Sequence, residues 1–279
     1  MIISIASGKG GTGKTTISTS LFLSIDNAQL LDCDVEEPNA HIFIKPEFNS
    51  PESVHLLIPE VDQNKCTLCG ECQKNCAFNA IAVVGKSTMV FEDLCHGCGV
   101  CSYVCPVNAI TEAEKEIGVV ETSRQSDIDF IRGTLNIGEN IAPPIINAVK
   151  KKINKSKTAI IDAPPGTSCP VITAMDGSDY CVLVTEPTPF GLNDLKLAVQ
   201  VVKKLEIPFG VVINRFDLGN DETEKFCDDN NIPVIMRIPF MKDIAKAYSS
   251  GIPLITAKPE LKPLFIEMFE TIKKQVNNK

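Results

Sequence analysis

Two groups of residues in this sequence have the types and spacing needed for chemistry, and the first is a glycine-rich loop near the N-terminus. The loop follows the apolar run 2–6, precedes a segment at 17–25 that is predicted to be helical, and reads Gly8-Lys9-Gly10-Gly11-Thr12-Gly13-Lys14-Thr15-Thr16. Successive backbone N–H groups of such a loop point into one concavity, and the helix N-terminus adds its positive dipole end. We therefore expect a nucleotide site rather than a flexible glycine loop, with Lys14 at the β- and γ-phosphates and the Thr15 hydroxyl on Mg²⁺.

The second group consists of eight cysteines in two runs that share one spacing. The first run contains Cys66, Cys69, Cys72 and Cys76, and the second contains Cys95, Cys98, Cys101 and Cys105. This spacing is that of the bacterial ferredoxin run, in which the fourth cysteine ligates the other of two [4Fe–4S] clusters. We therefore assign Cys66, Cys69, Cys72 and Cys105 to one cluster, and Cys95, Cys98, Cys101 and Cys76 to the other. Zinc is the alternative, but zinc sites join two distant pairs of cysteines, and runs of four do not fit that pattern.

The cysteine runs belong to an internal repeat that extends beyond the ligands. Residues 77–81 (Ala-Phe-Asn-Ala-Ile) correspond to residues 106–110 (Pro-Val-Asn-Ala-Ile). The first copy has Ala77 where the second has Pro106, a change that removes no ligand. We expect the linking segment 81–91 to form a hairpin, and the whole module to span residues 59–113.

Acidic and amide side chains stand at the ends of three apolar segments that are predicted to be strands. They are Asp32 and Asp34 after the run 28–31, Asp162 and the Pro-Pro-Gly turn through Gly166 after the run 158–161, and Asn214 and Arg215 after the run 209–213. In open α/β sheets, ligands bind outside the carboxyl ends of the strands, so these residues are expected near the nucleotide. The simpler alternative for Asp34 is that it caps the following turn.

Lys9 adds a resemblance to a known family. A lysine directly after the first glycine resembles the deviant Walker A loop of the MinD/ParA/Mrp and nitrogenase iron-protein ATPases. In that family this lysine reaches across a nucleotide-sandwich dimer, where a cation stabilises charge on the transferred phosphoryl group. The resemblance covers essentially the whole chain, and it implies a homodimer or a heterodimer with a similar ATPase. If the resemblance fails, Lys9 is only a solvated loop charge.

The resemblance also implies roles for individual residues. It makes Lys9, Lys14, Asp34 and Asp162 catalytic, with Asp34 positioning the attacking water. Asp162 joins Thr15 in the Mg²⁺ shell, and Asp32 contacts Mg²⁺ or a lysine. The Gly166 N–H is expected to face the γ-phosphate, and the Asn214 amide to bind adenine. The expected contacts of ATP or ADP are Gly8, Gly10, Gly11, Thr12, Gly13, Lys14, Thr15, Thr16, Gly166, Asn214 and Arg215.

Four cysteines lie outside the two runs. Cys169 stands seven residues after Asp162, an offset at which the nitrogenase iron protein, which this half resembles, has a cysteine that binds a bridging cluster. We hypothesise that Cys169 lines the dimer interface and binds or relays metal or sulfur there; the alternative is a small buried thiol. Cys33, Cys181 and Cys227 are expected to pack as small apolar residues.

Composition restricts the class of protein. The 279-residue chain has a net charge of −8 and no basic stripe, which argues against a nucleic-acid partner. It shows neither a signal peptide nor a membrane-length apolar run, so we expect a cytoplasmic protein. Structural disulfides are disfavoured there, and metal accounts better for its twelve cysteines. The apolar stripe of the predicted last helix, about 260–276, is expected to pack on the sheet, because its polar face lacks the basic residues typical of membrane attachment.

These features predict an α/β fold in two parts. Residues 1–58 and 114–279 are expected to form a mostly parallel P-loop NTPase sheet flanked by helices. A small α+β ferredoxin-like domain, residues 59–113, is expected to be inserted at one edge.

Three functions compete. The first couples nucleotide-driven dimerisation and ATP hydrolysis to electron transfer through two [4Fe–4S] clusters to a redox partner. The second is a metal-cluster assembly or carrier ATPase that serves an acceptor protein; Mrp-type carriers usually use a Cys-x-x-Cys near the C-terminus, and none follows Cys105. The third, spatial organisation on membrane or DNA, fits poorly with the acidic character and the cysteine runs. The sequence favours the first.

Overall fold

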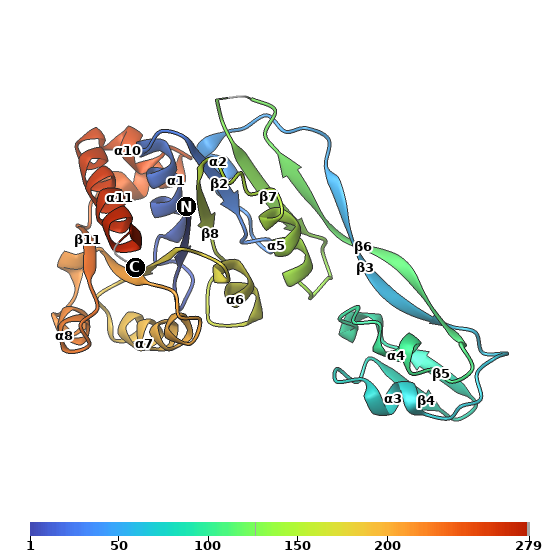
Figure 1. The fold of residues 1–279 in the computed structure, drawn as a ribbon. Helices are drawn as coiled ribbons and strands as arrows, with labels where there is room; N and C mark the ends of the chain where they lie inside the picture. Colours follow the sequence, from blue (N-terminus) through green and yellow to red (C-terminus); the bar gives the residue numbers. More distant parts are fainter. Residues whose placement is uncertain (126, 278–279) are drawn as a thin grey trace.

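The computed structural model, which describes residues 1–125 and 127–277, contains one large sheet covered by helices on both faces (Figure 1). Its strands are β1 Ile2–Ala6, β2 Ala28–Asp32, β3 Glu52–Val61, β6 Ile110–Thr122, β7 Phe130–Leu135, β8 Thr158–Asp162, β9 Tyr180–Thr185, β10 Phe209–Asn214 and β11 Val234–Ile238. In the described residues these nine strands lie in the order β11-β10-β9-β1-β8-β2-β7-β6-β3. Neighbours from β11 to β7 are parallel, whereas β6 and β3 are antiparallel to their neighbours. The prediction of a mostly parallel sheet with flanking helices is confirmed.

The helices of this body are α1 Lys14–Ser24, α2 His41–Ile44, α5 Pro143–Lys150, α6 Cys169–Met175, α7 Pro189–Lys204, α8 Glu222–Asp229, α9 Lys242–Ser249, α10 Leu254–Ala257 and α11 Lys262–Asn277. Helix α1 begins at Lys14, three residues before the predicted start, because the left-handed Gly13 (φ +96°) turns the loop directly into the helix. Helix α7 begins at Pro189, and the Thr188 hydroxyl caps it by accepting the Gly191 N–H at 3.0 Å.

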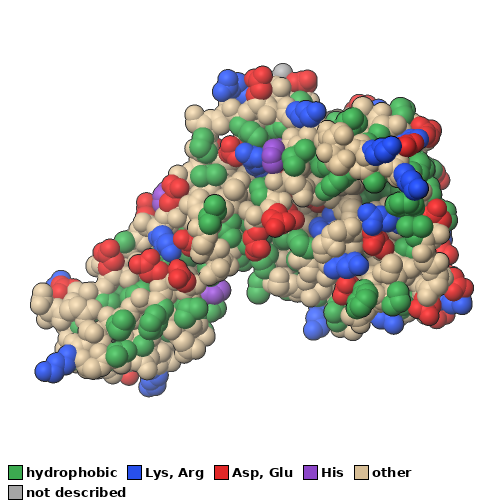
Figure 2. Space-filling model, turned by 180° about the vertical axis from the view of Figure 1, so that it is seen from behind, with side chains coloured by type: hydrophobic (Ala, Val, Ile, Leu, Met, Phe, Trp, Pro, Cys, Tyr) green, Lys and Arg blue, Asp and Glu red, His purple; other side chains and the backbone are tan. Residues whose placement is uncertain are grey.

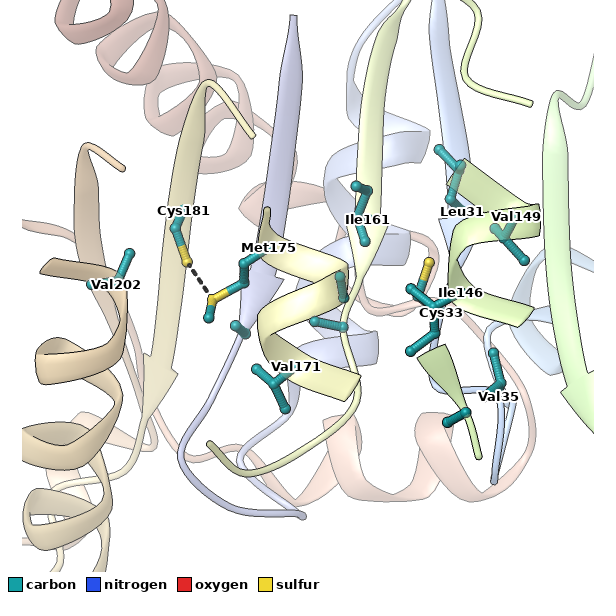
Figure 3. Packing of buried hydrophobic residues seen from close by; sticks show 14 of the residues in the cluster. Leu31, Cys33, Val35, Ile146, Val149, Ile161, Val171, Met175, Cys181 and Val202 are labelled. Carbon is teal, nitrogen blue, oxygen red and sulfur yellow. Dashed lines mark hydrogen bonds between the residues drawn. The ribbon is translucent and has the colours of Figure 1, made fainter. Parts of the chain in front are cut away.

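Two apolar clusters, one on each face, hold the helices to the sheet. One cluster packs α5, α6 and α7 against the strands, and Figure 3 shows part of it, including Cys33 and Cys181. The Cys181 thiol lies 3.6 Å from the Met175 sulfur, and Cys33, Cys181 and Cys227 are all fully buried. The expectation that these three cysteines pack as small apolar residues is confirmed.

The second cluster packs α1, α10 and α11 against the opposite face. Phe265, Met268 and Ile272 of α11 are buried in it beside residues of α1. This confirms that the apolar stripe of the last helix faces the sheet. None of the helices in the described part of the chain has both the length and the apolar composition needed to cross a bilayer.

Strands β3 and β6 extend beyond the sheet as a two-stranded arm that carries a small module at its end (Figure 1). The module, residues 59–113, contains α3 Glu71–Asn75, a hairpin of β4 Ile81–Val84 and β5 Ser87–Val90, a 3₁₀ turn Glu92–Leu94 and α4 Val100–Tyr103. The hairpin confirms the expectation for the linking segment. Pro59 pairs with Glu112 across the arm, so the module leaves and re-enters the body at adjacent points. Its assignment to the ferredoxin fold stays a prediction.

The module has a very small apolar core. One buried cluster consists of Cys72, Ile81 and Ile110, extended by partly buried neighbours that include three further cysteines. Ala80 and Cys95 are buried in the cluster that also contains Leu56 and Ile58 of the arm. Many apolar side chains of the module stay exposed, and Figure 2 shows green side chains gathered on its surface. Domains of this size usually need disulfides or a metal to supplement the core, and the cysteines here are free thiols.

The burial of α11 makes a testable prediction. Phe265→Ala removes a fully buried ring and should lower the free energy of unfolding by about 3–5 kcal/mol. Ile266→Ala on the same helix, at a side chain that is 40 % exposed, should change it by less than about 1 kcal/mol. Urea denaturation measures both, and equal losses would contradict the packing of this helix.

Candidate nucleotide and cluster sites

A cavity of about 430 Å³ lies where the glycine-rich loop meets the carboxyl ends of the strands. This volume is in the range of small-molecule sites. The predicted residues that line it are Gly10, Gly11, Gly13, Lys14, Thr15, Thr16, Asp34, Asn214 and Arg215. The sheet therefore brings together side chains that lie up to two hundred residues apart in the sequence.

Two contacts fix the shape of the glycine-rich loop. The Asn214 amide Nδ2 donates to the Thr12 carbonyl at 2.9 Å, and a Cβ at Gly13 would lie only 2.6 Å from the same nitrogen. At the other end, a Cβ at Gly8 would lie 2.2 Å from the Asp194 carbonyl oxygen of α7. Glycine is favoured at Gly8 because the backbone of Asp194 leaves no room for a side chain, and at Gly13 because of its left-handed backbone (φ +96°).

Asn214 therefore has a role that the sequence did not predict. Its Nδ2 binds the loop, and its Oδ1 accepts the Arg215 N–H at 3.0 Å. Arg215 itself has a left-handed backbone (φ +54°) and pairs with Glu186 at 2.8 Å. The expectation that Asn214 binds adenine stays a prediction, but its amide is first of all a support for the loop.

Three carboxylates meet below the cavity. Asp32 and Asp162 are direct partners on the neighbouring strands β2 and β8, and both are fully buried. Burial and the Asp162 carboxylate raise the pKa of Asp32, although the N–H groups of Ala40 and Asp34 donate to it. Burial raises the pKa of Asp34 to about 7, against the opposing effect of the Lys14 ammonium.

Asp162 provides a test of whether Mg²⁺ fits here. Neither of its carboxylate oxygens has a hydrogen-bond partner among the described residues, and burial raises its pKa to about 6. The hydroxyl of Thr15 and the Lys14 ammonium are its neighbours and oppose that shift. A buried carboxylate without a partner beside a hydroxyl is the kind of oxygen site that a hard divalent cation prefers, so these residues fit Mg²⁺.

The remaining predicted residues lie outside the cavity lining. Gly8 and Thr12 support the loop, and Asp162 lies beneath it. Lys9 is half-buried, and its carbonyl accepts the Ser7 hydroxyl at 2.5 Å. The expected contact of the Gly166 N–H with the γ-phosphate stays a prediction, and in this structure the N–H has another acceptor. It donates to the Ser7 carbonyl at 3.0 Å, because the turn after β8 folds back over the end of β1, and Pro165 lines the cavity instead.

Several residues that line the cavity were not predicted from the sequence. Glu37 and Asn39 follow Asp34, while Met241, Ile244 and Tyr248 come from the region of α9. Tyr248 also packs against Phe43 of α2, with ring centroids 5.0 Å apart. The Ile-Pro … Gly-x-Pro pattern around this helix resembles the family and implies that the segment covers the adenine, but it did not identify these individual residues.

The eight cysteines of the two runs line two separate pockets. The Cys66 pocket is lined by Cys66, Cys69, Cys72 and Cys105, and the Cys95 pocket by Cys95, Cys98, Cys101 and Cys76. In each pocket the fourth cysteine comes from the other run, which is the crossed arrangement that the spacing predicts. Among the described residues no three His, Cys, Asp or Glu side chains converge closely enough to hold a single metal ion.

The two pockets are built by equivalent backbone. Gly70 and Gly99 have φ of +78° and +72°, and Asn79 and Asn108 have φ of +54° and +49°. The N–H groups of Ala80 and Ala109 donate to the sulfurs of Cys76 and Cys105 at 3.3 and 3.2 Å. Backbone N–H groups that donate to sulfur stabilise thiolate ligands. Each pocket combines four cysteines with such a donor, and this combination fits an iron–sulfur cluster.

Cys169 lies apart from both pockets. It is the first residue of α6, directly after the turn that follows Asp162, and it is exposed. The alternative of a buried thiol is therefore wrong, because the side chain lies on the surface of the helix start. Its proposed place at a dimer interface stays a prediction.

Comparisons with known proteins agree with this geometry. The profile of a family described as "CobQ/CobB/MinD/ParA nucleotide binding domain" matches residues 3–254. Among relatives, the uncharacterized protein MJ0579 of Methanocaldococcus jannaschii is 35 % identical over 258 residues, which cover 90 % of each chain. An iron-sulfur cluster carrier protein of Pyrococcus furiosus is 24 % identical over 91 % of this chain and 78 % of that protein. The structure of the septum site-determining protein MinD of Pyrococcus horikoshii, solved with Mg-ADP, superposes on this chain with a TM-score of 0.59. The match covers 98 % of this chain and 96 % of that one at 22 % identity, and it shows the common fold.

The loop geometry predicts a difference between two of its glycines. Gly13→Ala would strain a left-handed backbone and press on Asn214, and should lower the free energy of unfolding by about 1–3 kcal/mol. Gly10→Ala meets no atom within 4 Å and should leave it within about 0.5 kcal/mol. Chemical denaturation without nucleotide compares them; equal stability of the two variants would show that the Asn214 contact does not constrain the loop.

Proposed function

Because the chain belongs to the CobQ/CobB/MinD/ParA nucleotide-binding family, we propose that it hydrolyses ATP and couples nucleotide-driven dimerisation to electron transfer through two [4Fe–4S] clusters. The electron comes singly from a low-potential one-electron donor protein and passes to a one-electron acceptor centre in a partner protein. The observation that carries this proposal is the gathering of the eight cysteines into two crossed pockets at the end of an arm attached to a nucleotide-binding body.

The cavity residues support the ATPase half of the proposal. Lys14 lies in the loop where the β- and γ-phosphates bind, and Thr15 with Asp162 would hold Mg²⁺. Asp34 lines the cavity and is the candidate that orients the attacking water. Lys9 lies outside this cavity, which agrees with a role at the phosphates of a partner subunit, either a second copy or a similar ATPase.

The cysteine module supports the redox half. When bound, a [4Fe–4S] cluster accepts and returns one electron. The chain supplies four thiolates to each pocket, directs backbone N–H groups at Cys76 and Cys105, and thereby stabilises the negative charge on these ligands. The small core of the module agrees with metal-dependent folding.

The chain connects the two halves directly. The loop that contains Asp34 leads through α2 into β3, the first strand of the arm. The Val35 carbonyl accepts the Leu135 N–H at 2.8 Å, so this loop is also tied to β7, the neighbour of β6. A nucleotide that contacts Asp34 differently in two states could therefore shift both strands of the arm.

A second candidate function is iron–sulfur cluster delivery. It is favoured by the names of several relatives, including the cluster carrier proteins of Pyrococcus furiosus and Rickettsia typhi, at 24 % and 26 % identity. In this alternative the clusters are cargo for an acceptor protein, and the exposed Cys169 is available for relay.

One titration separates the two functions. The full chain is reconstituted anaerobically, its iron content is measured, and its reduction potentials are followed by EPR with no nucleotide, with ADP and with a non-hydrolysable ATP analogue. Clusters that stay bound and change potential with nucleotide support the electron carrier. Reduction potentials that do not change with nucleotide, together with transfer of iron to an apo-protein acceptor, would contradict electron transfer and support cluster delivery instead.

Lys14→Ala should abolish measurable ATP turnover while leaving iron content and the visible absorption of the clusters unchanged, because Lys14 lies in the body and the cysteines in the module. Lys204→Ala, an exposed lysine at the end of α7, serves as the charge-matched control and should retain turnover. A coupled phosphate-release assay and iron analysis measure the two properties. Retained turnover in Lys14→Ala would exclude the assigned phosphate site.

A further inference from the structure

The internal repeat makes each cysteine pocket a control for the other. Equivalent positions lie twenty-nine residues apart, as Cys66 and Cys95 do, and Asn79 and Asn108. By this correspondence, three lining positions carry different polar chemistry in the two pockets. Thr67 in the Cys66 pocket corresponds to His96 in the Cys95 pocket. Thr88 in the Cys66 pocket corresponds to Pro59 in the Cys95 pocket, and Val83 corresponds to Glu112.

Thr88 offers the Cys66 pocket a hydrogen bond that the other pocket lacks at this position. Its hydroxyl lies 3.2 Å from the Cys66 sulfur, and the residue is only 4 % exposed. Gln63 binds both the N–H and the carbonyl of Thr88, at 3.1 and 2.8 Å, and so holds the residue in place. Once Cys66 is a thiolate it has no proton to give, so the hydroxyl must be the donor.

Glu112 brings a carboxylate to the Cys95 pocket. Its Oε1 accepts the Ser102 hydroxyl at 3.2 Å, and a Cβ at Gly99 would lie 3.0 Å from that oxygen. The equivalent Val83 brings no charge to the Cys66 pocket. The side chain of Glu112 is exposed, so solvent and salt weaken its effect relative to that of the buried Thr88.

We propose that Thr88 and Glu112 make the two clusters unequal, with the higher reduction potential in the Cys66 pocket, so that the first electron taken up resides there. This rests on the proposed function, in which each pocket holds a [4Fe–4S] cluster. Reduction adds one negative charge. A hydrogen bond to a ligand sulfur stabilises that charge, and a nearby carboxylate opposes it.

The other donors to sulfur do not reverse this order. The bonds from Ala80 and Ala109 are equivalent in the two pockets. The Gly97 N–H donates to Cys95 at 3.5 Å, which favours the Cys95 pocket, but this bond is longer than the 3.2 Å contact of Thr88. The His96 ring in the Cys95 pocket stacks on Phe78, with ring centroids 3.6 Å apart, and makes no hydrogen bond to a cysteine sulfur within the described residues. The order of the two potentials therefore rests on Thr88 and Glu112, which act in the same direction.

The test is an EPR-monitored potentiometric titration of the anaerobically reconstituted full chain, with titanium(III) citrate as the one-electron reductant. Two one-electron waves are expected. Thr88→Val should lower the potential of the upper wave only, and Thr88→Ser should restore it. Glu112→Gln should raise the lower wave only, by a shift that shrinks as salt is added.

Two neighbouring residues provide matched controls. Thr67→Val removes a hydroxyl that also lines the Cys66 pocket but makes no hydrogen bond to a cysteine sulfur within the described residues. Glu114→Gln removes a carboxylate from the same strand, β6, at a position that does not line the Cys95 pocket. Neither should move a wave.

The iron content, measured before any potential, separates the two ways of failing. Iron and sulfide below two four-iron clusters in the unaltered chain would overturn the proposed function and this inference with it. With both clusters present, a single unresolved wave, a lower wave that responds to Thr88→Val, or no response to either variant would overturn the inference alone.

Discussion

Two buried carboxylates on neighbouring strands are the constraint on which the nucleotide site depends. Asp32 and Asp162 are register partners in β2 and β8, and neither is exposed to solvent. Two negative charges that are both buried away from water raise the free energy of the folded state unless protons or cations neutralise them. Asp32 is partly satisfied by backbone N–H groups, whereas Asp162 is not, so the site gains most from a cation at the Asp162 side. Lys14, Thr15 and the loop glycines surround that place, and the parallel sheet supplies the strand ends that make it.

The same sheet also determines where the cysteine module lies. Its central strands are covered on both faces by helices, and among the described residues no further parallel strand follows β7 in the order. The antiparallel pair β6 and β3 completes this side and then continues past the body. Lys115 on β6 lies 3.0 Å from Glu139 of the body and 3.7 Å from Glu92 of the module. Such partly exposed ion pairs contribute little individually, but together they connect the arm to both the body and the module.

Local patterns in the sequence were enough to predict the elements that depend on local chemistry. The glycine-rich loop, the crossed cysteine sets and the hairpin between the runs follow from spacing, because each involves residues that are close in the chain or repeated. The bond from Asn214 to Thr12 joins positions 202 residues apart, and no local pattern indicates it. The bond from the Gly166 N–H to the Ser7 carbonyl is equally non-local, because Ser7 directly follows the first strand. The Ile-Pro … Gly-x-Pro pattern indicated that the segment around α9 covers the nucleotide, but which of its side chains reach the cavity, such as Tyr248, depends on how the last helices pack.

The arm has a mechanical consequence. Beyond the end of β7, residues 55–61 of β3 and their partners on β6 form a ribbon that starts at the sheet and ends inside the module. At about 3.3 Å per residue this ribbon is about 23 Å long, so a rotation of about 5° at its base displaces the far end by about 2 Å. The register shift between Val54 and His55 lies at that base, where a bulge concentrates bending. Such a ribbon amplifies small movements of the body. A movement too small to disturb the packing of the body displaces the cysteine pockets by at least the length of a covalent bond.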